Sequence, residues 1–447
     1  MALGPERLSA LILAQAEDDP VFARTVRMAL AAKNDASALA HAIDVRLKAI
    51  RRSRSFLEWD KLRALTRELD RLRATIAGPL AEQSPTLAIV HMRQFVHLAP
   101  SLFERADDSN GTLGDIFREG GDDLGRLWAA AKDQEPRALA AEILSLIEAD
   151  EYGMFDGLPE AASRALGSEG RATMRRLLLE RQASATSETR RKYDYKVRWL
   201  LPKLADLDGD VDAYIATVDQ GRRNALLNAK VAERLIAHDR AREALEWIDA
   251  PTEIGHNGRE LADLRLRALE RLGDKPAAQM QRRQIFERWL DREALRAWLR
   301  NLPDFEDEDA EQAALAHVAA HADATSALAF LVAWPDHART DRLIRARHDE
   351  LNGRNYVILR PAAEALYGRY PAAASLLYRR LVDGALDSAS FKNYPYAARD
   401  LKAAAALAEA IPGNAEIPSH EQWTLSLRER HGRKAGFWSI AEGWNAR

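Results

Sequence analysis

The chain has 447 residues, of which 47% are hydrophobic and 30% charged, and 65 basic against 68 acidic side chains give a formal net charge of −3. This composition excludes an intrinsically disordered chain, which could not bury enough apolar surface. The absence of Cys excludes a disulfide-framed secreted module and a metal site built from thiolates. The balanced charge argues against binding nucleic acid by bulk electrostatics and leaves room only for a local basic patch.

The N-terminal apolar stretch is short and flanked by charged residues. Residues 8–16 predict an amphipathic helix rather than the apolar core of a secretory signal. The most apolar window, residues 312–335, is interrupted by His317, His321 and Asp323, so it falls short of the ~20 apolar residues that span a bilayer. We therefore expect a cytoplasmic protein without a membrane segment.

Helices are predicted along the whole chain, so the fold class is all-α. Ala is abundant and β-branched residues never alternate over a run, which favours helices over strands. Apolar residues recur at helical spacing within residues 39–50 and 62–76, and each stripe must pack on a neighbouring helix. Prolines placed for a first helical turn, or residues placed as N-caps, mark helix starts. These are Pro20, Asp35, Pro85, Pro136 and Ser419.

The second half of the chain shows a recurring helical hairpin. Residues 235–245 and 271–278 each predict a helix, a tight polar turn and an Ala-rich helix start, with Asp239 and Asp274 35 residues apart. Residues 367–373 repeat the second pattern. This spacing is typical of tetratricopeptide arrays, so we predict an α-α superhelix, a tetratricopeptide-like helical-repeat solenoid. The full consensus is missing, and an Ala-rich bundle without repeats is the alternative.

Two composition shifts divide the chain. The small and polar run at residues 183–187 predicts a boundary between an N-terminal helical region, 1–185, and a tetratricopeptide-like hairpin region, 186–447. The acidic run at 304–311 predicts an exposed loop that enters a helix N-terminus, where the helix dipole favours carboxylates. A patch that binds a basic partner is the alternative for this run.

Signatures of catalysis are missing. The sequence has no GxxxxGK[ST], GxGxxG or GxSxG motif and no Cys nucleophile, so we expect no cofactor, the motifs identify no catalytic residue, and an enzyme is the less expected class. His317 and His321 have the spacing of a helical zinc site, but Val318 stands where a catalytic Glu would follow. We expect these His side chains to face solvent or to pack, and we predict no metal site.

An oxygen-rich loop precedes a predicted helix. Its register does not fit an EF-hand, because the first and twelfth positions would be Ala106 and Phe117, which cannot chelate calcium. We favour a turn followed by a helix that Thr112 caps, with Asp115 reaching back. A loop that binds a cation or another ligand is the alternative. Its binding residues would be Asp107, Asp108, Asn110 and Asp115.

A basic segment covers residues 171–203, with ten basic side chains against three acidic ones. The run Arg190, Arg191 and Lys192 lies beside Tyr195 and Trp199, and such a mixture can follow a phosphate backbone and stack bases. We favour a solvated helix face with the aromatic side chains in the core, because Tyr195 and Trp199 are one helical turn apart.

Five stretches carry a resemblance to known proteins. Residues 52–59, 98–111 and 152–153 resemble a bacterial, all-helical family of unknown function, domain-of-unknown-function family 6880. Residues 393–401 and 431–438 are similar to the helical tails of SWIM zinc-finger proteins. The resemblance implies a bacterial, all-helical, repeat-like protein and supplies no catalytic residue. Without Cys, the chain cannot form the metal module of the zinc-finger relatives.

These observations together favour a protein that binds other proteins or peptides. Stacked helical hairpins create an extended surface suited to such partners. We therefore expect a protein–protein interaction scaffold or adaptor. The alternative is a nucleic-acid-associated protein that binds through residues 171–203.

Overall fold

The computed structural model describes residues 4–131, 134–218, 224–251, 258–388, 390–413 and 417–443. These residues form helices joined by loops and contain no strand, so the predicted all-α fold is confirmed. One isolated β-bridge joins Leu57 and Ala106. Contacts divide the chain into two compact units, unit 1 (Met1–Arg222) and unit 2 (Arg223–Arg447). Within the described ranges, no helix is both long and apolar enough to cross a membrane.

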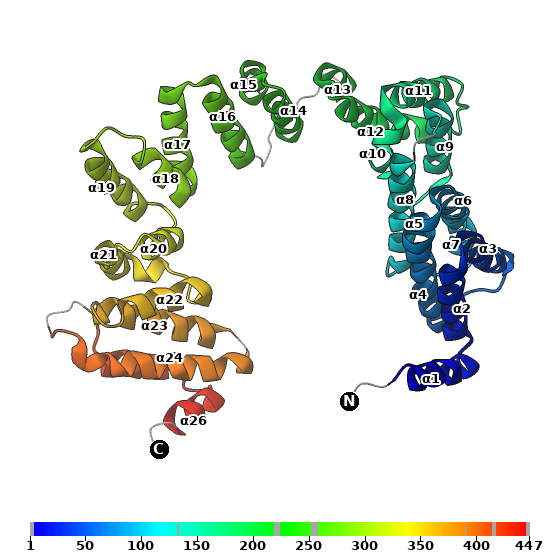
Figure 1. Ribbon diagram of the computed structural model, residues 1–447. Coiled ribbons are helices and arrows are strands. Elements are labelled where there is room, and N and C mark those ends of the chain that lie inside the picture. The colour runs from blue at the N-terminus through cyan, green and yellow to red at the C-terminus, as the bar shows by residue number, and fades with distance from the viewer. Residues whose placement is uncertain are drawn as a thin grey trace. The chain divides into compact units, whose positions relative to one another are not determined.

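Unit 1 contains long helices and a few short ones (Figure 1). They are α1 (Pro5–Asp18), α2 (Pro20–Asn34), α3 (Ala36–Arg52), α4 (Trp59–Thr75), the π-helix η1 (Ile76–Leu80), α5 (Ala81–Gln83), α6 (Pro85–Val96), α7 (Ala99–Phe103), α8 (Thr112–Ala130), α9 (Pro136–Ala149), α10 (Leu158–Ala161), α11 (Ser163–Ala183), α12 (Arg190–Asp208) and α13 (Val211–Val218).

Unit 2 contains shorter helices and three 3₁₀ turns, η2 to η4. They are α14 (Ala225–Ala237), α15 (Ala241–Asp249), α16 (Gly258–Leu272), α17 (Lys275–Trp289), α18 (Arg292–Leu299), α19 (Glu306–Ala319), α20 (Ala324–Ala333), α21 (His337–Arg347), η2 (His348–Glu350), α22 (Tyr356–Leu366), α23 (Pro371–Asp387), η3 (Phe391–Asn393), α24 (Tyr394–Ala406), η4 (Ala408–Ala410), α25 (His420–His431) and α26 (Ala435–Gly443).

The predicted helix starts are confirmed, because each depends on residues within a single turn. Helices α2, α6 and α9 begin at their prolines. Asp35 accepts a hydrogen bond from the Ala38 N–H at 2.7 Å, which satisfies one free donor of α3. Ser419 and Gln422 form a reciprocal capping box at the start of α25.

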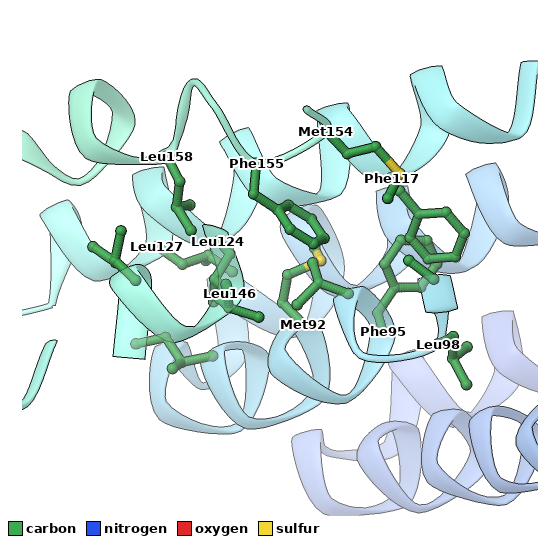
Figure 2. Packing of buried hydrophobic residues seen from close by; sticks show 14 of the residues in the cluster. Met92, Phe95, Leu98, Phe117, Leu124, Leu127, Leu146, Met154, Phe155 and Leu158 are labelled. Carbon is green, nitrogen blue, oxygen red and sulfur yellow. The ribbon is translucent and has the colours of Figure 1, made fainter. Parts of the chain in front are cut away.

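The core of unit 1 is built from the predicted apolar stripes and the helices around α8. The apolar stripe of α3 is buried throughout, from Leu39 to Ile50. Phe95 of α6 packs on Phe117 of α8, with ring centroids 5.3 Å apart (Figure 2). Gly121 lets the Phe155 ring approach α8, since a Cβ at this position would lie 2.9 Å from Phe155 Cδ1.

The core of unit 2 is organised around α23. Helices α22 and α24 both pack on α23, most of whose residues are buried (Figure 1). The helices before it pack mainly on their neighbours in the chain, α14 on α15, α15 on α16 and α16 on α17.

The last helices of unit 1 follow the predicted boundary at residue 185. Residues 183–187 lie at the junction of α11 and α12, and α12 packs back on α11. Lys196 of α12 is buried, and its Nζ donates a hydrogen bond to the Ile147 carbonyl of α9 at 2.5 Å. Contacts therefore place α12 and α13 in unit 1, and the division into residues 1–185 and 186–447 stays a prediction.

Candidate functional site

The segment before α4 is tied to the loop between α7 and α8. The Leu57 N–H donates to the Arg105 carbonyl at 2.9 Å. The buried Arg105 guanidinium donates to Ser53 Oγ and to the Ser55 and Ile50 carbonyls, at 3.1–3.2 Å. Burial lowers the pKa of Arg105. These bonds join two of the stretches on which the sequence resemblance rests, residues 52–59 and 98–111.

Asp108 caps helix α8 from within this loop. Its Oδ1 accepts a hydrogen bond from the Leu113 N–H and its Oδ2 accepts one from the Gly114 N–H, each at 2.8 Å. The predicted cap by Thr112 is wrong, because Gly111 occupies the N-cap position in the left-handed conformation with φ of 73°. A carboxylate that reaches forward across the turn satisfies these donors in place of Thr112.

The other oxygen-rich residues of the loop are also engaged. Asp107 Oδ1 accepts from the Ser109 N–H at 3.1 Å, and Asn110 Oδ1 accepts from the Thr112 N–H at 3.2 Å. Asp115 does not reach back to the loop and instead pairs with Arg118. No group of three or more His, Asp or Glu placed to hold a metal ion occurs among the residues that the structure describes.

A cavity of about 380 Å³ lies between α4 and this loop, and we name it the α4 pocket. Trp59, Arg63 and Arg67 of the lining follow one face of α4 at four-residue spacing. Trp59, at the start of this helix, is 58% exposed. The residues that line the pocket are Trp59, Leu62, Arg63, Thr66, Arg67, Asp108, Asn110 and Thr112.

The charges of the α4 pocket are unbalanced. Arg67 Nε donates to the Arg63 carbonyl at 3.3 Å, and neither guanidinium forms an ion pair with any residue in the described ranges. Asp108 is the single carboxylate of the lining, and both of its oxygens accept backbone hydrogen bonds. The pocket therefore presents two exposed cations and an exposed indole ring.

A second cavity, of about 220 Å³, is lined by residues of α6, α7, the end of α9 and the segment that follows α9. The Phe103 and Tyr152 rings stack in this lining, with centroids 4.7 Å apart. Asp150 holds the segment by accepting hydrogen bonds from the Tyr152 and Phe155 N–H groups. The third stretch of the resemblance, residues 152–153, thus also lies against α7.

Most cations of the basic segment have partners within unit 1. Arg171 and Arg175 bond to Asp208, and Lys203 pairs with Glu160 at 2.6 Å. Partners also engage Arg176, Arg181 and Lys196. Four exposed cations have no ion pair in the described part of the chain. They are Arg190, Arg191, Lys192 and Arg198.

The aromatic side chains of the basic segment divide between core and surface. Tyr195 is 65% exposed, so the expectation that it belongs to the core is wrong for this residue. Trp199 is half-buried and lies under the Lys203 ammonium, which is 4.6 Å from the ring centroid. Arg191, Tyr195 and Arg198 follow one exposed face of α12 at helical spacing.

The pair His317 and His321 serves local contacts. His317 packs beside Phe286, and its Nε2 lies 3.0 Å from the Glu287 carbonyl oxygen. His321 Nδ1 accepts a hydrogen bond from the Asp323 N–H at 3.1 Å. The two imidazoles are therefore engaged in separate contacts.

A buried polar cluster between α23 and α25 escaped the sequence analysis, and we name it the α23–α25 seam. Arg379 is buried, donates to the Pro418 carbonyl at 2.8 Å and lies 5.2 Å from the Trp423 ring centroid. Asp383 pairs with Arg430 at 2.9 Å. Burial raises the pKa of Asp383 and lowers those of Arg379 and His420.

One sequence pattern indicates the α23–α25 seam. Ser375, Arg379, Asp383 and Asp387 recur at four-residue steps on α23, whose other residues are largely apolar. A polar stripe on an otherwise apolar helix indicates a polar contact with a neighbouring element. We interpret the seam as the contact that fixes α25 on α23.

Comparison with known proteins gives one match. The sequence profile described as a family of unknown function (DUF6880) matches residues 1–440. No curated protein and no solved structure matches the chain.

Proposed function

The chain belongs to the DUF6880 family, whose function is unknown, and we propose from its own surfaces that it is a protein-interaction scaffold. The partner-binding surface belongs to unit 2, whose helices form a tetratricopeptide-like array. Support comes from the packing of successive helices on their neighbours in the chain, the pattern of a solenoid. Asp274 opens α17 as its N-cap and Pro371 opens α23, at the hairpins that the sequence predicts.

The partner contacts the face formed by α22 and α24. Arg360 Nη2 donates to Asp400 Oδ2 at 2.8 Å and links these two helices. Both helices pack on α23. Tyr356 lies one turn before Arg360, and Tyr396 lies one turn before Asp400. We name this surface the α22–α24 face.

One observation carries the proposal: this face exposes large aromatic side chains beside a largely buried helix, α23. Tyr356 is 63% exposed and Tyr396 is 58% exposed, while Val357 beside Tyr356 is also exposed. The Arg399 guanidinium lies 5.7 Å from the Tyr396 ring centroid. Tyr and Arg are enriched among the residues that contribute most to protein–protein affinity.

Site-specific photo-crosslinking in the source organism tests the proposal. A photoreactive amino acid at Tyr356 or Tyr396 should capture the same partner protein. The matched control is Met280 of α17, which is 64% exposed in the same unit. With the purified partner, Tyr356→Ala combined with Tyr396→Ala should weaken binding about tenfold or more. Equal capture from Met280, or unchanged affinity of the double variant, would contradict the proposal.

A second candidate function is association with nucleic acid through α12. The observation that favours it is the group of cations near the exposed Tyr195 ring that have no ion pair within the described ranges, which combines phosphate neutralisation with a stacking surface. Arg190→Glu combined with Arg191→Glu should abolish retention of single-stranded DNA or RNA at low salt and flatten the salt dependence of binding.

The control for α12 is Arg176→Glu, which reverses the charge of a single side chain that pairs with Glu180. It should leave most of the affinity intact. If the wild-type chain shows no retention on nucleic acid at low salt, this second function is excluded.

A further inference from the structure

We propose that the α4 pocket binds a free nucleotide of the nucleoside monophosphate class, a small organic phosphate that carries a planar ring. This ligand site lies in unit 1 and is independent of the scaffold function proposed for unit 2. The inference rests on three properties of the lining: its unused hydrogen-bonding groups, its charge and its exposed ring.

The unused polar groups of Arg63, Arg67, Asn110 and Trp59 are all hydrogen-bond donors. Among the residues that the structure describes, the guanidinium groups of Arg63 and Arg67 have no acceptor other than the Arg63 carbonyl that Arg67 Nε engages. Asn110 uses its oxygen to accept from the Thr112 N–H, so its amide N–H₂ remains as a donor. Trp59 adds an indole N–H, which can only donate. Such a set complements a ligand rich in acceptor oxygens.

The charge of the pocket selects an anion. Arg63 and Arg67 are one turn apart on α4, and guanidinium forks bind phosphate oxygens with charge-assisted hydrogen bonds. Asp108 does not compensate them by an ion pair, since both of its oxygens cap α8. This cap also occupies the Leu113 and Gly114 N–H groups, so the anion is held by side chains rather than by the helix end.

Trp59 favours a ligand that carries an aromatic ring. Trp59 opens the same face of α4, one turn before Arg63, and more than half of its side chain is exposed. An aromatic base that stacks on this indole would bury both ring surfaces. The cavity of about 380 Å³ falls within the size of small-molecule sites, roughly 300–1,000 Å³. Ring and cations on one helix face match the two ends of a mononucleotide.

Isothermal titration of the full chain with AMP, adenosine and inorganic phosphate tests the proposal. AMP should bind saturably and at least about tenfold more tightly than either part alone, because it engages both the ring and the cations. Arg63→Gln combined with Arg67→Gln should weaken AMP binding at least about tenfold. Trp59→Ala should weaken AMP binding while leaving the weaker binding of phosphate unchanged, and Trp59→Phe should restore part of it.

The matched control is Lys61→Gln on the opposite side of α4, which removes a cation outside the pocket lining and should leave AMP binding unchanged. Thermal melts show whether each variant is folded. No saturable AMP binding, or AMP binding that survives the Arg63 and Arg67 double variant, would overturn the proposal. Tighter binding of an oligonucleotide that needs the same three residues would replace it with a nucleic-acid site.

Discussion

The backbones of Gly353 and Gly384 lie in direct contact. A Cβ on Gly384 would lie 2.2 Å from the Gly353 carbonyl carbon, and a Cβ on Gly353 would lie 2.0 Å from the Arg380 carbonyl oxygen. The loop before α22 therefore packs on the backbone of α23. Arg380 fixes the same contact, because its Nη2 donates to the Leu351 carbonyl at 2.7 Å.

Gly384→Ala should destabilise unit 2. The new methyl group would meet backbone atoms, which cannot rotate away, so we expect a loss of about 3 kcal/mol in the free energy of unfolding. Gly368→Ala is the control, since a Cβ there would meet nothing within 4 Å, and it should change stability by less than about 0.5 kcal/mol. Urea denaturation compares the two. Equal urea midpoints of the two variants would contradict this prediction, because they would show that the loop before α22 can move away from α23 without a loss of stability.

The buried carboxylate of Asp400 predicts that stability depends on pH. Burial raises the pKa of Asp400 from 3.8 to about 6, despite the opposing effect of Arg360. The folded chain therefore holds this proton more tightly than the unfolded chain. The raised pKa of Asp400 therefore contributes to the free energy of unfolding. This contribution is complete below pH ~4 and is lost as the pH rises through ~6, a change of roughly 2–3 kcal/mol.

The measurement for Asp400 is urea denaturation from pH 4 to 7 of the wild-type chain and of Asp400→Asn. As the pH rises, the free energy of unfolding of the wild type should fall relative to that of Asp400→Asn. Glu429→Gln, at an exposed position of α25, should show a much smaller change. A difference between wild type and Asp400→Asn that stays constant over this range would contradict the raised pKa.

Arg105 should hold the segment before α4 in place. Arg105→Met keeps the apolar stem but removes the donors to Ser53, Ser55 and Ile50, so we expect a loss of about 2–3 kcal/mol. Arg54→Met, at an exposed position nearby, should cost less than about 0.5 kcal/mol. Thermal and urea melts measure both. If the two variants are equally stable, the hydrogen bonds of Arg105 do not hold this segment.

Asp108 should act as a helix cap rather than as a calcium ligand. Asp108→Ala leaves the Leu113 and Gly114 N–H groups without their acceptor, so we expect a loss of about 1–2 kcal/mol. Millimolar calcium should leave the melting temperature of the wild type unchanged. A calcium-dependent rise that Asp108→Ala abolishes would instead support the cation-binding loop.

Helix starts and apolar stripes could be predicted from the sequence because both depend on neighbouring residues. Asp35 and Ser419 act within one turn, and the stripe from Leu39 to Ile50 follows the helical period. The cap of α8 could not be predicted in the same way. Asp108 reaches donors five and six residues ahead, across a left-handed Gly111, which lies outside the local capping patterns.

The candidate sites depend on contacts that local patterns do not encode. The α4 pocket brings Trp59 and Arg63 beside Asn110, whose loop is joined to the segment before α4 through Leu57 and Arg105. The Arg379 guanidinium likewise donates to the Pro418 carbonyl, 39 residues later in the chain and just before α25. The tetratricopeptide-like superhelix and the similarity of the C-terminal stretches to SWIM zinc-finger tails stay predictions.

The pairing of Leu57 with Arg105 has a kinetic consequence. This pairing closes a long loop, as does the bond of Arg73 to Asp123 at 2.5 Å. The chain loses the entropy of such a loop before it forms the contacts that stabilise the closed state. In unit 2, helices α14 to α17 pack mainly on their neighbours in the chain, and such local contacts form quickly. These helices should therefore acquire protected amides before the segment around Leu57 during refolding. Pulse-labelled hydrogen exchange would reveal that order directly, and earlier protection of the Leu57 segment would refute it.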